Sequence, residues 1–262
     1  MKGPTKQSER HVEAVLAALH VMDCFLTIPA LGIKQIMDET GFTRNRVMRL
    51  TGTLLHKGYL VSDEATGAFT PGSKILSLSK AFERNQGIVI LVRPVLREIA
   101  LHTGESVSFF IREGFDRVVL AREEGTQAIR YAVAEGQRMD LHAGAGGKVL
   151  LAFASEGILE SFLSKNAMNK RTVQTITNKI KLKEELKKIR RQGFAISKGE
   201  RVSDAYAIAA PVFDVDGGLA GALGIAGPIS RFTSAIRMSF QRMIVDHAGK
   251  LSDQLTWNQN KK

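Results

Sequence analysis

Apolar residues recur at helical spacing near the start of the chain and predict two short helices. The first helix extends to Phe25, and Ser8 is a candidate N-cap for it. Its predicted apolar face consists of Val12, Val15, Leu16, Leu19 and Met22. The second helix follows Leu31-Gly32, places Ile33, Ile36 and Met37 on one face, and ends at Gly41.

A third helix and a hairpin follow directly. Thr43 is a suitable N-cap for a helix that extends to about His56 and stops at Gly58. Residues 59–61 and 68–70 predict two strands joined by Ser-Asp-Glu-Ala-Thr-Gly, and Pro71-Gly72 closes the unit. Two short helices separated by a glycine, with a hairpin behind them, are typical of a winged helix-turn-helix.

After residue 73 the pattern changes from helical to mixed. It predicts helices at about 73–86, 89–102, 146–154, 179–192 and 232–256, and strands at 107–111, 117–121, 207–213 and 219–225. We therefore expect an α/β (α+β) fold class with two domains. The winged helix-turn-helix would occupy residues 1–74, a linker helix residues 75–87, and a mixed α/β domain residues 88–262.

The predicted third helix has one apolar face and one face without acidic residues. Val47, Leu50 and Leu54 form a stripe on a helical wheel, flanked by Thr51 and Leu55. The opposite side carries Asn45, Arg46, Arg49, Thr53 and His56, and residues 43–57 contain no Asp or Glu. A solvated surface helix usually mixes charges of both signs, so the pattern favours contact with a nucleic acid.

The residue types on this face suit the two kinds of DNA contact. Arg can bind guanine and Asn can bind adenine through paired hydrogen bonds, while the helix N-terminus and nearby basic residues suit phosphates. The candidate DNA-binding residues are Thr43, Arg44, Asn45, Arg46, Arg49, Thr53 and Lys57. Asp63 and Glu64 near the hairpin tip would repel phosphate, so a wing that only packs and a wing that enters a groove both stay open.

Composition narrows the class of protein. Hydrophobic residues make up 44% and charged residues 24% of the 262, which excludes a disordered or fibrous chain. Cys24 is the only cysteine, so the chain cannot form an internal disulfide or a cysteine-based metal site. Cys24 has apolar neighbours on its helix, and we expect it to be a core residue. Neither a membrane span nor a signal peptide is recognisable, so we expect a soluble, cytoplasmic protein.

The net charge is +11, but it is unevenly placed. Residues 1–75 hold nine Lys/Arg against seven Asp/Glu, whereas residues 165–191 hold ten against two. Most of the excess therefore lies far from the N-terminus, and the total charge cannot by itself argue for nucleic acid. The basic helix predicted at 179–192 is either a solvated surface helix or a second contact for DNA or for an acidic partner.

A glycine-rich segment, Leu141-His-Ala-Gly-Ala-Gly-Gly-Lys-Val-Leu-Leu-Ala, lies at a predicted turn into a helix. It does not match a phosphate loop, because Val149 stands where Ser or Thr must hold magnesium, and it lacks the last glycine of a dinucleotide motif. Either small residues allow close packing there, or free N–H groups at the helix start bind an anion such as a carboxylate. The histidines show no metal-ligand spacing and no catalytic triad motif is present, so we expect no cofactor, no metal and no enzyme activity.

Together, several segments resemble the IclR family of bacterial transcriptional regulators. They are Gly41-Phe-Thr-Arg-Asn-Arg-Val-Met-Arg-Leu, Leu55-His-Lys-Gly-Tyr-Leu, Arg93-Pro-Val-Leu, Thr103-Gly-Glu, the segment at 142–152, Ile189-Arg-Arg-Gln-Gly-Phe-Ala-Ile, Gly199-Glu200, Ile208-Ala-Ala-Pro-Val-Phe-Asp and Gly227-Pro228. They occur in family order from about residue 10 to 245. The resemblance implies an operator-binding winged helix, a GAF-like domain for a small-molecule effector and for oligomerisation, and homodimers or dimers of dimers.

The resemblance also implies where an effector would bind. The helix-start donors match Ala145 and Gly146, and the apolar wall matches Tyr131, Met139 and Ala205. Family members that bind small acids place Asp, Cys, Ser and Ser at positions that here are Ser197, Ala207, Gly224 and Ala226. Only one hydroxyl remains, so two hypotheses stay open: a roomier, more apolar pocket for an aromatic or alkyl carboxylic acid, or a degenerate pocket that binds nothing.

These observations lead to one main functional hypothesis. The chain would be a ligand-responsive DNA-binding transcriptional regulator, whose helix 43–56 reads the major groove of operator DNA. Two alternatives stay open: a constitutive DNA-binding regulator with a degenerate pocket, and an enzyme that acts on a small acid.

Overall fold

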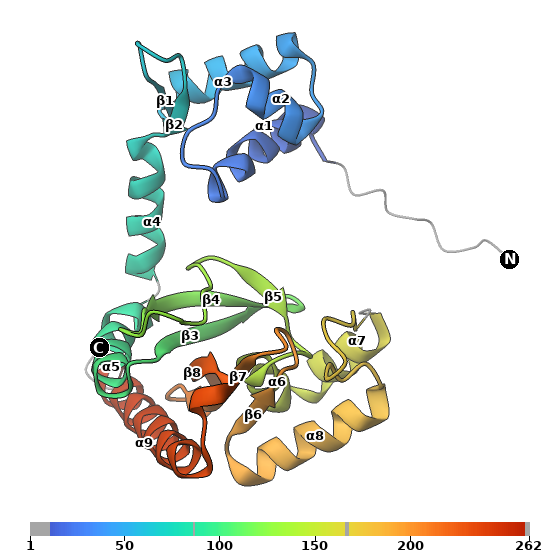
Figure 1. Cartoon of the computed structure of the whole chain (residues 1–262), viewed down its shortest axis with the longest axis vertical. Helices are drawn as coiled ribbons and strands as arrows, with labels where there is room; N and C mark the ends of the chain where they lie inside the picture. The colour runs from blue at the N-terminus through green and yellow to red at the C-terminus, as the bar shows by residue number, and fades with distance from the viewer. Residues whose placement is uncertain (1–10, 86, 166–167, 260–262) are drawn as a thin grey trace, which may run out of the picture. The chain divides into compact units, whose positions relative to one another are not determined.

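The computed structural model describes residues 11–85, 87–165 and 168–259, and the chain forms two compact units, Met1–Gln86 and Gly87–Lys262 (Figure 1). In the first unit, α1 (Glu13–Asp23), the 3₁₀ helix η1 (Cys24–Leu26), α2 (Ile33–Thr40) and α3 (Arg44–His56) precede a two-stranded antiparallel sheet. The strands are β1 (Leu60–Ser62) and β2 (Phe69–Pro71), and α4 (Ser73–Asn85) follows them. This arrangement is a helix-turn-helix backed by a hairpin.

Glycine and backbone pairing position α2 and α3. Gly41 ends α2 in the left-handed conformation with φ 70°, and its N–H donates to the Met37 carbonyl at 2.8 Å. Leu31 and Phe69 exchange two backbone hydrogen bonds, of 3.0 and 2.9 Å, which attach the segment before α2 to the hairpin. The buried core of this unit consists of Val21, Phe25, Leu31, Ile36, Val47, Leu54, Leu60 and Phe69.

The predicted apolar face of the first helix is wrong. Val12, Val15, Leu16 and Leu19 are exposed, while Ala17 and Val21 are the buried residues of α1. The helix is apolar on most of its circumference, so its sequence could not tell which side the other helices would cover. Cys24 is half-buried in η1 and packs against the core of this unit. The predicted cap Ser8 lies outside the described residues.

The second unit is built on a six-stranded antiparallel sheet of order β5-β4-β3-β8-β7-β6. Its strands are β3 (Ser106–Glu113), β4 (Asp116–Glu123), β5 (Arg138–Asp140), β6 (Ala195–Lys198), β7 (Ala205–Phe213) and β8 (Leu219–Pro228). Its helices are α5 (Ile88–Thr103), α6 (Ala145–Ala152), α7 (Glu156–Lys165), α8 (Lys179–Gln192), the 3₁₀ helix η2 (Ile229–Arg231) and α9 (Ser234–Gln259). The predicted mixed α/β fold is thereby confirmed.

Side chains that alternate along the strands form two cores, one on each face of the sheet. In β7, Ile208, Ala210 and Val212 pack with the helices α5 and α9, whereas Ala209 packs on the other side with α6, α7 and α8 (Figure 1). The sequence patterns did not predict β5, β6 or α7. The two strands are short edge strands of the sheet, and their register is set by neighbours distant in sequence.

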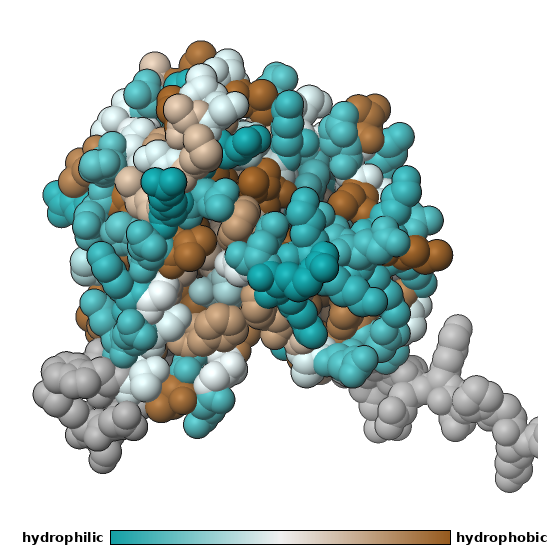
Figure 2. Space-filling view, turned by 90° about the horizontal axis from the view of Figure 1, so that it is seen from below, coloured by the Kyte–Doolittle hydropathy of each residue, from teal (hydrophilic) through white to brown (hydrophobic). Residues whose placement is uncertain are grey.

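Helix α8 is rich in basic residues and has an apolar side. Leu182, Leu186 and Ile189 are buried, whereas Lys187 and Lys188 are exposed. The surface in Figure 2 is largely hydrophilic, with single hydrophobic residues scattered among the polar ones. The guanidinium of Arg190 differs from these charges in that it donates to the carbonyls of Ala152 and Ala154 at the end of α6.

Within the described segments, we find no helix with both the length and the apolar character that crossing a bilayer requires.

Candidate nucleic-acid interface and ligand pocket

Helix α3 presents its polar face to solvent. Val47, Thr51 and Leu54 are buried, and Leu50 and Leu55 are half-buried, as the wheel predicted. The predicted DNA-contact residues Thr43, Arg44, Asn45, Arg49, Thr53 and Lys57 are all exposed. Thr43 occupies the N-cap position but makes no side-chain capping bond, so the first N–H groups of the helix lack a side-chain acceptor from that residue.

Arg46 lies in a different environment from the one predicted. Its Nη2 donates to Glu13 Oε1 of α1 at 2.9 Å, and its guanidinium carbon lies 4.4 Å from the centre of the Phe42 ring. Glu13 therefore supplies a carboxylate that the composition of residues 43–57 did not reveal. Arg46 therefore links α3 to α1 within the first unit, whereas Arg49 is exposed.

The hairpin tip is organised by Asp63. Its Oδ1 accepts hydrogen bonds from the N–H groups of Ala65 and Thr66 and from the Thr66 hydroxyl, at 3.0, 2.7 and 2.8 Å. These hydrogen bonds, that of the Thr66 N–H first, lower the pKa of the Asp63 carboxyl below its usual value. The carboxylate therefore stays charged at neutral pH and serves the turn itself.

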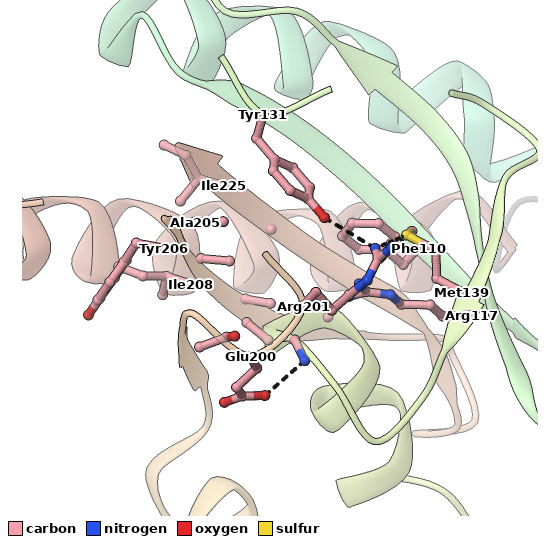
Figure 3. A pocket seen from close by; sticks show the side chains of 17 residues that line it. Phe110, Arg117, Tyr131, Met139, Glu200, Arg201, Ala205, Tyr206, Ile208 and Ile225 are labelled. Atoms are coloured by element: carbon pink, nitrogen blue, oxygen red, sulfur yellow. Dashed lines mark hydrogen bonds between the residues drawn. The ribbon is translucent and has the colours of Figure 1, made fainter. Parts of the chain in front are cut away.

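The second unit contains a cavity between the start of α6 and the strands β3, β4, β7 and β8 (Figure 3). Of the sequence-predicted effector residues, the structure places Tyr131, Met139, Ala145, Gly146, Ser197, Ala205, Ala207 and Gly224 around it. Ala226 does not line it. Ala226 shares a face of β8 with Gly224, two residues earlier, but it lies nearer the end of the strand and outside the lining of the cavity.

The cavity is small and has charged residues in its lining, which argues against the roomier, more apolar of the two hypotheses. Its volume is about 40 Å³, enough for a few water molecules. Figure 3 shows the Phe110 ring and two arginines filling the space that small residues leave open. The sequence reasoning missed Phe110, Arg117 and Arg201, along with Glu200. Arg117 is the first residue of the predicted strand 117–121. Side chains alternate between the two faces of a strand, and this alternation was the signal that could have identified Arg117 as facing the cavity.

The two guanidinium groups converge on the sulfur of Met139. Arg117 Nη2 lies 3.7 Å from that sulfur, and Arg201 Nη1 contacts the same atom and also donates to the Tyr131 hydroxyl at 3.2 Å (Figure 3). Desolvation by burial, and then repulsion from Arg201, lower the pKa of Arg117 to about 10.

The start of α6 forms the floor of the cavity. Gly144 has φ 92°, and its N–H donates to Glu200 Oε2 at 2.9 Å. A Cβ at Gly146 would lie 2.6 Å from Cδ2 of Phe110, so only glycine allows this helix to approach the ring so closely. Residues Ala145 and Gly146 belong to the first turn of α6, where N–H groups have no acceptor within the helix.

Below the cavity, Lys148 is buried and fully bonded. Its ammonium donates to Glu200 Oε1 at 2.6 Å, to Glu185 Oε1 at 2.9 Å and to the Ile196 carbonyl at 2.8 Å. The lysine of the glycine-rich segment therefore holds Glu200, which in turn holds the N-terminus of α6. Among the described residues, no group of three His, Cys, Asp or Glu side chains could hold a metal ion.

Comparison with known proteins identifies relatives of the chain. The model of the bacterial transcriptional regulator IclR C-terminal domain matches residues 81–253, and that of the IclR helix-turn-helix domain matches residues 14–64. The chain is 31% identical over 241 residues to the HTH-type transcriptional regulator BhcR of Paracoccus denitrificans, covering 92% of this chain and 86% of the relative.

Solved structures agree with this result. The IclR protein of Thermotoga maritima superimposes with a TM-score of 0.81 at 26% identity, over 94% of this chain and 100% of that chain. An IclR homologue from Microbacterium hydrocarbonoxydans, solved in complex with 4-hydroxybenzoate, superimposes with a TM-score of 0.77 over 92% of this chain and 98% of that chain. At 18% identity, this second likeness concerns the fold alone.

Proposed function

Since the chain belongs to the IclR family of bacterial transcriptional regulators, we propose that it is a ligand-responsive DNA-binding regulator whose α3 reads operator DNA in the major groove. The observation that carries the proposal is the exposed face of α3, where Asn45 and Arg49 are free of any acidic residue of their own helix. Asn45 and Arg49 would contact base edges, and Arg44 and Lys57 would contact phosphates.

The proposed partner of the second unit is a small organic acid bound in the cavity at the start of α6. The N–H groups of Ala145 and Gly146 and the charged side chains around them support an anionic effector. The complex of the Microbacterium homologue with 4-hydroxybenzoate supports an acid as the class of ligand. Binding would change the affinity for DNA if the ligand prefers one of two conformations of the protein.

We also propose that two copies of the chain bind DNA together. The exposed apolar residues Val12, Val15, Leu16 and Leu19 of α1 support this, because an apolar helix face of this kind is usually covered by a partner. A symmetric dimer would place two α3 helices on half-sites about one helical turn apart. Sedimentation equilibrium of the full chain tests the dimer, and a purely monomeric protein would contradict it.

We propose three functional regions along the chain and a cellular location for it. The DNA-binding domain would occupy residues 1–74, a linker helix 75–87 and the effector-binding and oligomerisation domain 88–262. A transcriptional regulator acts where the DNA is, so we place the protein in the bacterial cytoplasm. Its relatives are named as regulators, and we propose no enzymatic activity for it.

Selection of bound sequences from a random DNA pool, followed by gel-shift measurements, tests the DNA-binding role. Arg49→Ala should weaken specific binding by about 1–3 kcal/mol and relax the preference at one base pair. Arg46→Ala should lose less specificity, because Glu13 and Phe42 already hold that guanidinium. Equal affinity of wild type and Arg49→Ala for the selected operator would refute the assignment of α3 as the reading helix.

One alternative is favoured by a specific observation. The small volume of the cavity, about 40 Å³, favours a constitutive regulator with a closed pocket. That alternative predicts that no acid raises the melting temperature of the protein and that DNA affinity is the same with and without acids. The ligand-responsive function predicts both stabilisation and a shift in DNA affinity.

A further inference from the structure

Arg117 is a buried cation without a carboxylate partner. The residue is 4% exposed, and its single hydrogen bond in the structure is the weak one to the Met139 sulfur. The guanidinium lies over the Phe110 ring, 5.0 Å from its centre, and its Nε is buried with no hydrogen-bond partner among the described residues. A buried arginine is ordinarily paired with an anion, and the described part of the fold provides no directly bound anion for Arg117.

The nearest carboxylates are already engaged with other cations. Glu200 gives one oxygen to Lys148 and the other to the Gly144 N–H. Asp140 accepts from the Arg171 guanidinium through both oxygens, at 2.6 and 3.2 Å. Both acids attract the Arg117 charge from a distance, but among the described residues neither forms an ion pair or a hydrogen bond with it.

A second guanidinium lies beside the first. Arg201 is half-buried, comes from the connection between β6 and β7, and contacts the same Met139 sulfur as Arg117 (Figure 3). The positive charge of Arg201 also disfavours the charged form of Arg117. Two like charges held this close in a largely apolar cavity repel each other, and an anion with two negative groups would relieve the repulsion.

The start of α6 lies next to Arg117. A Cβ at Gly144 would lie 3.1 Å from Arg117 Nη2, and one at Gly146 would lie 3.3 Å from Arg117 Nη1. The glycines therefore let the first N–H groups of the helix and one guanidinium meet the same point in space. A carboxylate there would receive charge-assisted hydrogen bonds from both sources.

We propose that Arg117 and Arg201 form a two-cation receptor and that the effector of this protein is a small dicarboxylate. One carboxylate binds Arg117 together with the Ala145 and Gly146 N–H groups, and the other binds Arg201. The inference rests on the proposed role of the cavity as an effector site, which it makes more specific.

The size of the cavity requires one side chain to move. Arg201 is half-buried, while Arg117 is fixed in the sheet, so Arg201 is the group that swings outward to admit the ligand and then binds it. Tyr131 and Met139, which Arg201 contacts in the closed state, are released by this movement. A dicarboxylate of three or four carbons would thus replace the contacts that the closed state provides.

Isothermal titration calorimetry of the full chain, at fixed ionic strength, tests the ligand class. The probes are malonate and succinate against propionate and butyrate, which keep the chain length and lose one carboxylate. We expect each dicarboxylate to bind roughly tenfold or more tightly than its matched monocarboxylate. Equal affinities within a pair, or no binding of either dicarboxylate, would overturn the proposal.

Three variants distinguish specific binding by Arg117 and Arg201 from a general effect of the positive charge of the protein. Arg201→Gln should reduce the affinity for succinate to the level of butyrate, and Arg117→Met should abolish binding of both. Arg191→Gln, which removes one exposed charge from α8, should change neither affinity. An Arg201→Gln protein that still prefers succinate overturns the two-cation receptor.

The stability of Arg117→Met gives an independent readout. Replacing an unpaired buried cation by an apolar residue of similar length should leave the melting temperature of the ligand-free protein equal or higher. If the variant is instead less stable or does not fold, Arg117 also has a structural role, and the half-buried Arg201 then carries the binding test through Arg201→Gln.

DNA binding measured in parallel keeps this inference distinct from the proposed function. If the protein retains selected operator DNA but shows no dicarboxylate preference, only the present inference fails. If it binds succinate selectively but no DNA, the proposed regulatory function fails and the receptor stands.

Discussion

Removing the buried ammonium of Lys148 should destabilise the second unit strongly. Lys148 is 1% exposed, and Lys148→Met keeps its length while deleting three hydrogen bonds. Glu200, 8% exposed, would keep its charge with only the Gly144 N–H as partner. Breaking a buried pair by removing one member costs about 3–5 kcal/mol, because the remaining charge is not solvated.

The components of that cost can be separated. The side chain of Glu185 is 24% exposed and can be hydrated, so its lost bond contributes little. The Ile196 carbonyl and the Glu200 carboxylate carry the penalty, since both lose a donor inside the fold. Lys148→Met/Glu200→Gln should therefore be more stable than Lys148→Met alone, because the neutral amide needs no counter-charge.

Urea denaturation followed by far-ultraviolet circular dichroism measures these effects, with separate transitions allowed for the two units. Lys183→Met is the matched control. Lys183 also forms an ion pair, 2.8 Å from Glu160, but the two side chains are 44% and 55% exposed, so its loss should cost under about 1 kcal/mol. If Lys148→Met costs no more than this control, or if the double variant is no more stable than the single one, the buried network does not hold the start of α6.

Three further outcomes are expected. Ile36→Ala should cost about 2–5 kcal/mol in the first unit alone, because Ile36 is fully buried in its core; a change in the second transition of the urea curve would contradict this. Gly146→Ala should abolish acid binding while leaving operator binding intact, since its Cβ would lie 2.6 Å from the Phe110 ring; calorimetry and gel shifts measure the two effects, and unchanged acid affinity would show that the ring moves freely. Burial raises the pKa of Asp140, but the hydrogen bond and charge of Arg171 outweigh it and lower that pKa below its usual value. The stabilisation from this pair is therefore complete above the pKa of the unfolded chain and is lost as pH falls through the lower folded pKa. Arg171→Gln should flatten that acid dependence in melting curves recorded between about pH 2 and 5, and an unchanged profile would refute the assignment.

Local sequence patterns were sufficient to predict most of the helices and strands and the exposed face of α3. The wheel separated Val47 and Leu54 from Asn45 and Arg49 correctly, because burial along one helix follows a fixed angle per residue. The predicted bounds of α8 agree with the structure, and Asn178 caps it through hydrogen bonds to two N–H groups. Short edge strands such as β5 escaped the patterns because three residues carry too little periodicity.

The cavity at the start of α6 was only partly predictable from the sequence, since the family resemblance gave some of its residues and the tertiary structure gave the rest. Eight of the nine residues that the family resemblance predicted line the cavity, including Ala145, Ser197 and Gly224. Of the two hypotheses for this pocket, the small volume of about 40 Å³ argues against the roomier one, because Ala and Gly open space that a neighbour can fill. Phe110 and the two arginines fill it from β3, β4 and the connection between β6 and β7, and no pattern in the sequence pairs those segments.

What the sequence by itself determined are the properties set within one segment: the helices, the turn at Gly41, the acid-free content of residues 43–57 and the family to which the chain belongs. Only the tertiary structure decided which charges have partners. Glu13 neutralises Arg46 and Lys148 holds Glu200, while Arg117 is buried unpaired. The physical reason is that an ion pair depends on distances of a few ångströms between residues that the chain separates by tens of positions, and the fold alone sets those distances.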